Sequence, residues 1–204
     1  MSICHHLGLE VGRRIADYTY TTYMIQNKII DPDGKFVLDY SQEDHRNKAI
    51  SVMLEFYDYM SEYLTLFPMF GTLLGIFRND DLIPHDGDID FGYFLNEQTQ
   101  LVSALENIHN KSGFLVIRNQ FNDLFTVGKD GVLIDLYRYD DHGADSISQG
   151  SRKPYYLLRN ELHPLSEIEF RGSKMISIAD PTAFFTRYYG DDWKTPKDFR
   201  QCKN

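Results

Sequence analysis

Residues 83–92 read IPHDGDIDFG, with three aspartates at every second position and apolar residues around them. In an extended strand successive side chains point to opposite faces, so Asp86, Asp88 and Asp90 would share one face and the apolar residues would take the other. Three like charges on one edge repel one another and resist losing water. The pattern therefore predicts either a cation held among the carboxylates or a solvated acidic loop.

The composition is that of one globular domain with a net negative charge. The chain has 204 residues, of which 42% are hydrophobic and 14% aromatic, which is enough to build a sizeable core. With 21 basic and 30 acidic residues the formal net charge is -9, and the sequence contains no basic run. We therefore expect no nucleic-acid partner and no anionic membrane face, and a phosphate ligand would need metal ions to help bind it.

No targeting or membrane-spanning segment is apparent in the sequence. The first fourteen residues lack a basic region followed by a long apolar core. The most apolar run, residues 63–77, is interrupted by proline and glycine and is too short for a bilayer, which needs about 20 residues. Cys4 and Cys202 form no C-x-x-C pair, which suits a reducing compartment. We expect a cytoplasmic protein with no transmembrane segment.

Periodicity and turn residues predict an α+β fold, with a mixed sheet flanked by helices. Helical spacing occurs at 9–27, 44–64 and 97–110. Short apolar runs that predict strands occur at 66–70, 88–94, 114–119, 124–129 and 132–139. We treat residues 1–204 as a single domain, in which residues 1–45 are an N-terminal helical extension.

Three local motifs mark turns and a helix boundary. DPDGKF, residues 31–36, predicts a turn. The Asp130–Gly131 pair is typical of a hairpin turn between the last two predicted strands. Asp180 followed by proline predicts the start of a helix that ends near Gly190.

Several residues before the aspartate strand suit a phosphate ligand. Gly71 and Thr72 follow a predicted strand and precede a predicted helix, where backbone N–H groups and a hydroxyl can meet a phosphate, although such a pair is also an ordinary turn or cap. Arg78 lies just beyond and is a candidate fork for a phosphate group. His85 is a candidate for a phosphate or a base edge, and a histidine in a loop also has structural uses.

A further acid lies in VLIDLYRY, residues 132–139, where Asp135 stands between apolar residues. Its neighbours would face the core and Asp135 the opposite face. An acid flanked by so much apolar sequence needs a cation or a firm hydrogen bond. If this strand pairs with the aspartate strand, Asp135 lies within reach of Asp88 and Asp90; the alternative is an ion pair with Arg138 on an exposed strand.

Together these motifs resemble the signature of the polymerase-β-like nucleotidyltransferase superfamily: Gly-Thr, then DIDF, then IDL. More narrowly, FGTLLGIFRNDDLIPHDGDIDFG, residues 70–92, is similar to the central motif of the LicD/fukutin family, which includes phosphocholine and phospho-alditol transferases that use CDP-activated donors. Residues 163–181 and 188–196 are similar to that family's closing segment. His85 stands where the family usually has tryptophan, and Gly87 where a larger residue is common.

The resemblance implies a polymerase-β-like nucleotidyltransferase fold and a metal-dependent transferase. It implies that Asp88, Asp90 and Asp135 are the catalytic residues and the ligands of Mg²⁺, or of Mn²⁺ as the alternative metal. Two such ions about 4 Å apart would activate an acceptor hydroxyl and neutralise the leaving phosphate. The nucleotide- or phosphate-binding residues would be Gly71, Thr72, Arg78, His85 and Asp86.

Two enzyme reactions remain open on this basis. In the first, a phospho-substituent passes from a CDP-linked donor to a sugar hydroxyl of a cell-surface glycan, and CMP is released. In the second, a nucleoside monophosphate passes from a nucleoside triphosphate to a small molecule or a protein, and pyrophosphate is released. The LicD-like surroundings favour the first. Tyr188 and Tyr189 suit either stacking on a ligand or packing, whereas we expect Trp193 to pack into the core.

A calcium-binding module is the alternative from a different class. Counted from Asp86, acids fall at positions one, three and five, and Glu97 falls at position twelve, which is the spacing of an EF-hand loop. The sixth position, where that loop needs glycine, is Phe91, and the segment around it has the pattern of a strand. We therefore expect the transferase.

Overall fold

The computed structural model describes residues 24–25, 29, 32, 37–120, 124–143, 145–149 and 156–197. Of the predicted helix at 9–27, only Met24 and Ile25 fall within these residues, and both are helical. The rest of that helix and most of the predicted turn at 31–36 lie outside the described residues.

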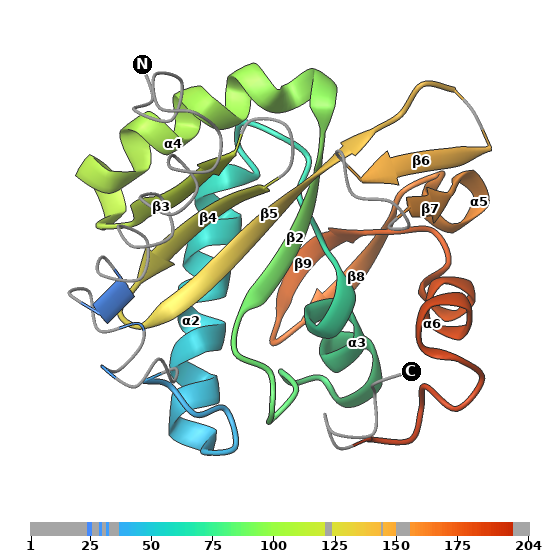
Figure 1. Cartoon of the computed structure of the whole chain (residues 1–204), viewed down its shortest axis with the longest axis horizontal. Helices are drawn as coiled ribbons and strands as arrows, with labels where there is room; N and C mark the ends of the chain where they lie inside the picture. The colour runs from blue at the N-terminus through green and yellow to red at the C-terminus, as the bar shows by residue number, and fades with distance from the viewer. Residues whose placement is uncertain are drawn as a thin grey trace.

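The elements alternate between helices and strands in an α+β fold (Figure 1). The helices are α2 (Glu43–Met60), α3 (Phe70–Asn79), η2 (Leu95–Glu97), α4 (Gln98–Ser112), α5 (Arg159–Leu162) and α6 (Pro181–Tyr189). The strands are β1 (Phe67–Pro68), β2 (Ile89–Phe94), β3 (Leu115–Gln120), β4 (Leu124–Lys129), β5 (Val132–Asp140), β6 (Ser146–Gln149), β7 (Tyr156–Leu158), β8 (Ser166–Phe170) and β9 (Ser173–Ser177).

The main sheet is mixed, as the sequence predicts. Its central path runs β1-β2-β5-β4-β3, while β6 pairs with the end of β5, and β7 with β6. The β2–β5 pair is parallel, and its neighbours β1 and β4 are antiparallel to it. Strands β8 and β9 form a separate hairpin. The only parallel pair among the described strands is therefore the one that carries the aspartates.

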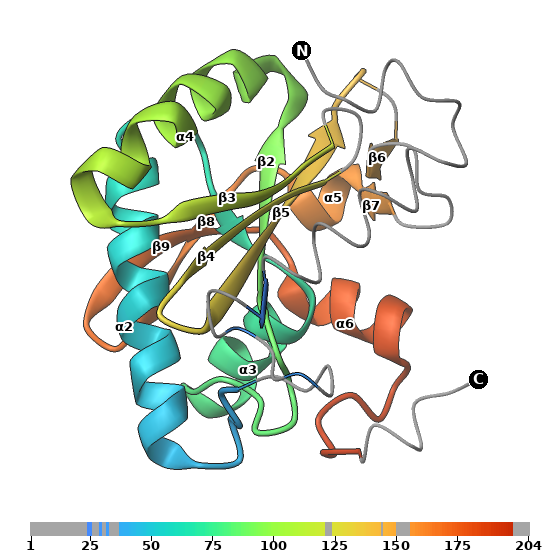
Figure 2. The ribbon, with the colours of Figure 1, turned by 60° about the vertical axis from the view of Figure 1, so that its left-hand side comes forward.

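Helices α2 and α4 cover one face of this sheet (Figure 2). Phe56 and Met60 of α2 belong to the same fully buried cluster as Phe91 of β2 and Ile134 of β5. The helical period of α2 and the alternation of the strands place these apolar side chains together. This layer is the main hydrophobic core.

A second apolar cluster lies on the other side of the sheet, where it includes Phe67 of β1 and packs against Phe94 at the end of β2. It joins residues of α3, α6, β5, β6, β7 and the segment after β9, among them Leu73, Tyr139 and Phe184. Trp193 packs in this cluster and is 5% exposed, which confirms its predicted packing role. Within the described residues, no helix has both the length and the apolar character that crossing a membrane requires.

The predicted boundaries are mostly confirmed. Asp130 and Gly131 have φ values of 53° and 88° and join β4 to β5, as a hairpin turn requires. The side chain of Asp180 caps α6 by accepting a hydrogen bond from the N–H of Ala183 at 2.9 Å, and the helix ends before Gly190. Helix α2 ends at Met60 rather than at residue 64, because the chain turns after it.

Candidate active site

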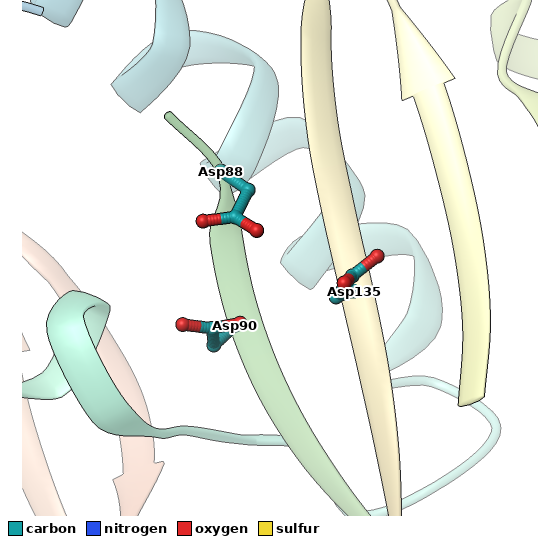
Figure 3. Close-up of side chains that lie close together, drawn as sticks. All are labelled: Asp88, Asp90 and Asp135. Atoms are coloured by element: carbon teal, nitrogen blue, oxygen red, sulfur yellow. The ribbon is translucent and has the colours of Figure 1, made fainter. Parts of the chain in front are cut away.

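The sheet register brings three carboxylates together. Asp90 of β2 lies directly opposite Asp135 of β5 in the parallel ladder, and Asp88 precedes β2 by one residue. One carboxylate oxygen from each of the three lies within 4.8 Å of the others. Figure 3 shows Asp90 on β2, Asp135 on the neighbouring β5, and Asp88 where the chain enters β2. We call these residues the acidic triad.

The start of α3 is tied to the aspartate strand. The hydroxyl of Thr72 accepts a hydrogen bond from the N–H of Asp90 at 2.9 Å, and the N–H of Met69 donates to the carbonyl of Asp90 at 2.9 Å. Gly71 and Thr72 are the second and third residues of α3 rather than a turn before it. Because Thr72 is buried and its hydroxyl supports β2, a contact of its side chain with phosphate stays a prediction.

Asp86 occupies the space above Gly71. A β-carbon at position 71 would lie 2.1 Å from an oxygen of the Asp86 carboxylate, so only glycine leaves room for that group. The same carboxylate accepts a hydrogen bond from the N–H of Gly87 at 3.1 Å and shares another with the carboxyl of Asp88. Asp86 itself lies in the turn before β2, whereas the alternation predicts a strand position. The reason is that its N–H bonds to the carbonyl of Ile83 at 3.0 Å and closes that turn.

Asp135 receives a hydrogen bond from the neighbouring strand. Thr126 lies opposite it in β4, and the hydroxyl of this fully buried threonine donates to the Asp135 carboxylate at 2.5 Å. Arg138, three residues further along β5, points to the other face because side chains alternate, and it forms a bidentate pair with Asp140 at 2.9 Å. Asp135 therefore faces Asp88 and Asp90, and Thr126 orients its carboxylate from β4.

Burial sets the protonation of the cluster. It raises the pKa of Asp86 to about 6. Burial also raises the pKa of Asp88 to about 6, with the charge of Asp86 as the next cause. The pKa of Asp90 lies well above its usual value because the group is buried and because Asp88, Asp86 and Asp135 repel its negative charge. Crowded carboxylates of this kind favour a proton or a cation between them.

The donor set fits a divalent cation. Three carboxylate groups supply the hard oxygen ligands that Mg²⁺ prefers, and a bound cation would relieve the repulsion that raises their pKa values. The triad of Asp88, Asp90 and Asp135 is thus typical of a divalent-metal site.

The remaining residues of the predicted phosphate set lie apart from this arrangement. Arg78 is in the last turn of α3, at the opposite end of the helix from Gly71, where its guanidinium donates to the carbonyl of Trp193 at 3.3 Å. His85 is exposed in the turn between α3 and β2. Their roles toward a nucleotide stay predictions.

Three residues of the site escaped the motif search. The hydroxyl of Tyr137 donates to the Asp90 carboxylate. Because Tyr137 lies two residues after Asp135 in the same strand, alternation could have predicted that both side chains share a face. Thr126 and Tyr40 gave none, because they lie far from the motifs in sequence. Tyr40 is 1% exposed, its hydroxyl has no hydrogen-bond partner among the described residues, and burial with the charges of Asp88 and Asp86 raises its pKa.

The structure excludes the EF-hand alternative. Phe91, at the sixth position of the supposed loop, is a fully buried residue in the middle of β2. Glu97, at the twelfth, uses one carboxylate oxygen to accept hydrogen bonds from the N–H and the hydroxyl of Thr65, at 3.1 and 2.9 Å. The segment pairs as a strand with β1 and β5 and cannot wrap around an ion.

A mixed sheet that aligns three carboxylates on a central parallel pair, with a Gly-Thr helix start hydrogen-bonded to it, is typical of the polymerase-β-like nucleotidyltransferase fold and provides a candidate acidic metal site. Residues 63–177 match the family described as LicD/FKTN/FKRP, nucleotidyltransferase domain. The chain belongs to this family, as its motifs predict.

Comparison with individual proteins gives more distant similarities. An uncharacterized protein of Rickettsia typhi is 25% identical over 127 residues, and the match covers 58% of this chain but only 38% of that protein. The lincosamide antibiotic adenylyltransferase LnuA, in its lincomycin-bound structure, shares 16% identity with a TM-score of 0.46, over 64% of this chain and 78% of that one. ANT(2″)-Ia in complex with adenylyl-2″-tobramycin shares 13% identity with a TM-score of 0.48, over 72% and 78% respectively.

Proposed function

We propose that this protein transfers a phospho-substituent, of the phosphocholine or phospho-alditol type, from a CDP-activated donor to a sugar hydroxyl of a cell-surface glycan. The observation that carries the proposal is the register of Asp90 against Asp135, with Asp88 beside them. Membership of the LicD family supports the donor class.

In the reaction, the acceptor hydroxyl oxygen attacks the phosphorus that bears the substituent. A new oxygen–phosphorus bond forms, and the bond from that phosphorus to the bridging oxygen breaks, so that CMP leaves with the bridging oxygen and the electron pair. The hydroxyl proton passes to a carboxylate. Asp135 suits this role because Thr126 orients its carboxylate from behind.

The acidic triad would hold Mg²⁺, or Mn²⁺ as the alternative, and the bound metal would neutralise charge on the phosphates. The other groups position the site. Tyr137 donates to Asp90 and fixes its carboxylate, and Thr72 holds the backbone of Asp90 against α3. Gly71 leaves the space in which Asp86 sits beside Asp88.

The test is a product assay with Mg²⁺ and a panel of donors. CDP-choline, CDP-ribitol, CDP-glycerol, CTP and ATP are each incubated with the protein and a mixture of sugar acceptors, and CMP and pyrophosphate are both measured. We expect CMP from at least one CDP-linked donor. Pyrophosphate from CTP or ATP, with no CMP, would instead establish nucleotidyl transfer.

Two variants control the assay. Asp90→Asn removes one triad charge and should stop product formation. Asp130→Asn makes the same chemical change in the exposed hairpin turn, at a φ of 53° that asparagine tolerates, and should leave the rate unchanged. Equal activity of the two variants would contradict the assignment of the triad.

A further inference from the structure

A buried tyrosine beside the acidic triad has no part in the reaction described above. Tyr40 lies in the turn before α2 and is 1% exposed, and its hydroxyl has no hydrogen-bond partner among the described residues. A buried hydroxyl without a partner costs folding free energy, so proteins seldom keep one unless a ligand or a water accepts from it. Tyr40 stands before residues 63–177, the part of the chain that matches the family, so the family match assigns it no role.

The hydroxyl of Tyr40 lies within the electrostatic reach of two carboxylates of the site. Burial raises the pKa of Tyr40, and the negative charges of Asp88 and Asp86 are the next causes. Charges act clearly on a buried group only over short distances. These two carboxylates share a hydrogen bond with each other, and Asp86 also accepts from the N–H of Gly87 at 3.1 Å. The hydroxyl of Tyr40 therefore stays protonated and presents a neutral donor to the acidic site.

Hydrogen bonds hold the turn that carries Tyr40 in place. The guanidinium of Arg46, in the first turn of α2, donates to the backbone carbonyl of Tyr40 at 2.6 Å and to the carboxylate of Asp81 at 3.1 Å. Asp81 lies between α3 and β2, in the same loop as Asp86. Arg46 therefore ties the turn before α2 to the loop that carries Asp86. A ligand does not have to order this turn in order to meet the hydroxyl of Tyr40.

A neutral donor suits a phosphate in this acidic site better than a cation does. A lysine or an arginine at this place would pair with the carboxylates and compete with Mg²⁺ for them, whereas a phenol carries no charge. Arg78, the predicted phosphate fork, donates instead to the carbonyl of Trp193 at the far end of α3. A phosphate at the triad would bring anionic oxygen acceptors, and a hydrogen bond to such an acceptor is stronger than one between neutral groups.

We propose that the hydroxyl of Tyr40 donates a hydrogen bond to a phosphate oxygen of the nucleotide donor, so that the turn before α2 completes the active site. The inference rests on the proposed function for a donor that carries phosphate, and it adds a binding residue to that function. It does not depend on which head group is transferred.

The test removes only the hydroxyl, by Tyr40→Phe, and measures binding and stability separately. Calorimetry with CDP and Mg²⁺ should show roughly 10- to 100-fold weaker binding, the range for a hydrogen bond to a charged group. The metal-free variant should unfold at the same temperature as the original protein or at a higher one, because the unpartnered hydroxyl is gone. Unchanged affinity for CDP would overturn the proposal. A lower unfolding temperature would also overturn it, because it would show that the hydroxyl has a partner within the protein.

Tyr93→Phe is the matched control. Tyr93 is fully buried and its hydroxyl also lacks a partner among the described residues, but its side chain belongs to the main core, on the opposite face of β2 from Asp90. The same deletion should therefore leave the affinity for CDP unchanged. If Tyr93→Phe weakens CDP binding as much as Tyr40→Phe does, the effect follows from the loss of any buried hydroxyl and the proposal is wrong.

A titration with Mg²⁺ alone separates a phosphate contact from a contact with water on the metal. Tyr40→Phe and the original protein should bind Mg²⁺ equally well in the absence of nucleotide, because no phosphate is then present. A loss of Mg²⁺ affinity as large as the loss of CDP affinity would assign the hydroxyl to the water around the metal and would contradict the proposal.

The same measurements distinguish this inference from the proposed function. If the protein releases pyrophosphate from CTP but no CMP from a CDP-linked donor, and Tyr40→Phe weakens CTP binding by the expected factor, the role of Tyr40 stands and the CDP-linked donor is wrong. If the protein releases CMP from a CDP-linked donor and Tyr40→Phe binds CDP normally, the transferase stands and the role of Tyr40 is wrong.

Discussion

The two faces of the β2–β5 pair share one backbone and one register but differ completely in chemistry. On one face Ile89, Phe91 and Leu136 are fully buried against α2 and α4. On the other, Asp90 and Asp135 stand opposite each other and repel. The apolar face fixes the strand register. The register in turn holds the carboxylates close together although their charges repel one another. One face therefore supplies apolar packing, and the proposed function rests on the other.

The largest effect should follow from the acidic face. Asp90→Asn should lower turnover by at least about a thousandfold, because it removes a ligand charge from a site whose catalysis rests on positioning and charge stabilisation. The apo protein should be as stable as the original or slightly more so, since one of the crowded charges is gone. Product assays measure the loss of turnover, and urea unfolding with EDTA measures the stability of the apo protein. Unfolding of the variant at markedly lower urea would contradict the division between the faces.

The apolar face should respond in the opposite way. Phe91→Ala should lower the free energy of unfolding by about 3–5 kcal/mol, the usual cost of deleting a buried phenyl ring. Phe77→Ala is the comparison, because this ring is 43% exposed and should cost much less. Urea unfolding measures both. Similar losses for the two variants would show that β2 does not dominate the core.

Alternation and local motifs were sufficient to predict most of this strand pair. The period of two in residues 88–91 and 132–139 assigns the acidic and apolar faces, and the Asp130–Gly131 turn fixes where β5 begins. The predicted proximity of Asp135 to Asp88 and Asp90 is confirmed. The alternation and the turn are local, so the sequence carries them directly, whereas the pairing of β2 with β5 joins segments that are far apart in the chain.

Features that depend on tertiary contact were not predictable in the same way. Asp86 leaves the strand because its N–H closes a turn, and Gly71 is small to accommodate Asp86 rather than to form a turn of its own. The ring of Phe70 contacts those of Tyr137 and Tyr188, which lie far from it in the chain. The periodicity of the sequence does not predict these ring contacts, because they depend on how α3 and α6 pack.

The hydrogen bond from Thr126 of β4 to Asp135 predicts a large rate loss for a change at Asp135 and a smaller one for a change at Thr126. Asp135→Asn should lower the rate by at least about a hundredfold, the usual scale for loss of a general base. Thr126→Val keeps the shape of the buried side chain but removes the donor to Asp135, so its rate loss should be smaller, about tenfold. The pH profile of the rate should shift in Thr126→Val, because a donor that stabilises the carboxylate is lost. An unchanged profile would assign Thr126 a packing role only.

The smallest expected effect is a dependence of stability on pH, which we expect the crowded carboxylates on the acidic side of the pair to cause. Burial raises the folded-state pKa of Asp86 and of Asp88 to about 6, above the unfolded value of 3.8. The stability from these groups is therefore fully present below about pH 4 and is lost as the pH rises through about 6. Between these limits the free energy of unfolding of the metal-free protein should fall by up to about 3 kcal/mol for each group, less what solvent screens at these half-buried side chains.

This window can be assigned to the crowded carboxylates because the shifted acids outside them titrate at lower pH. The N–H of Gly143 and the guanidinium of Arg159 lower the pKa of Asp141 to about 2, so its contribution changes only below about pH 4. Urea unfolding at pH 4.5, 5.5, 6.5 and 7.5 with EDTA should show the fall, and Asp88→Asn should flatten it. Mg²⁺ should reverse the trend, because it competes with protons for the same carboxylates and stabilises more as the pH rises. A fall of equal size in Asp88→Asn would show that Asp88 is not its source.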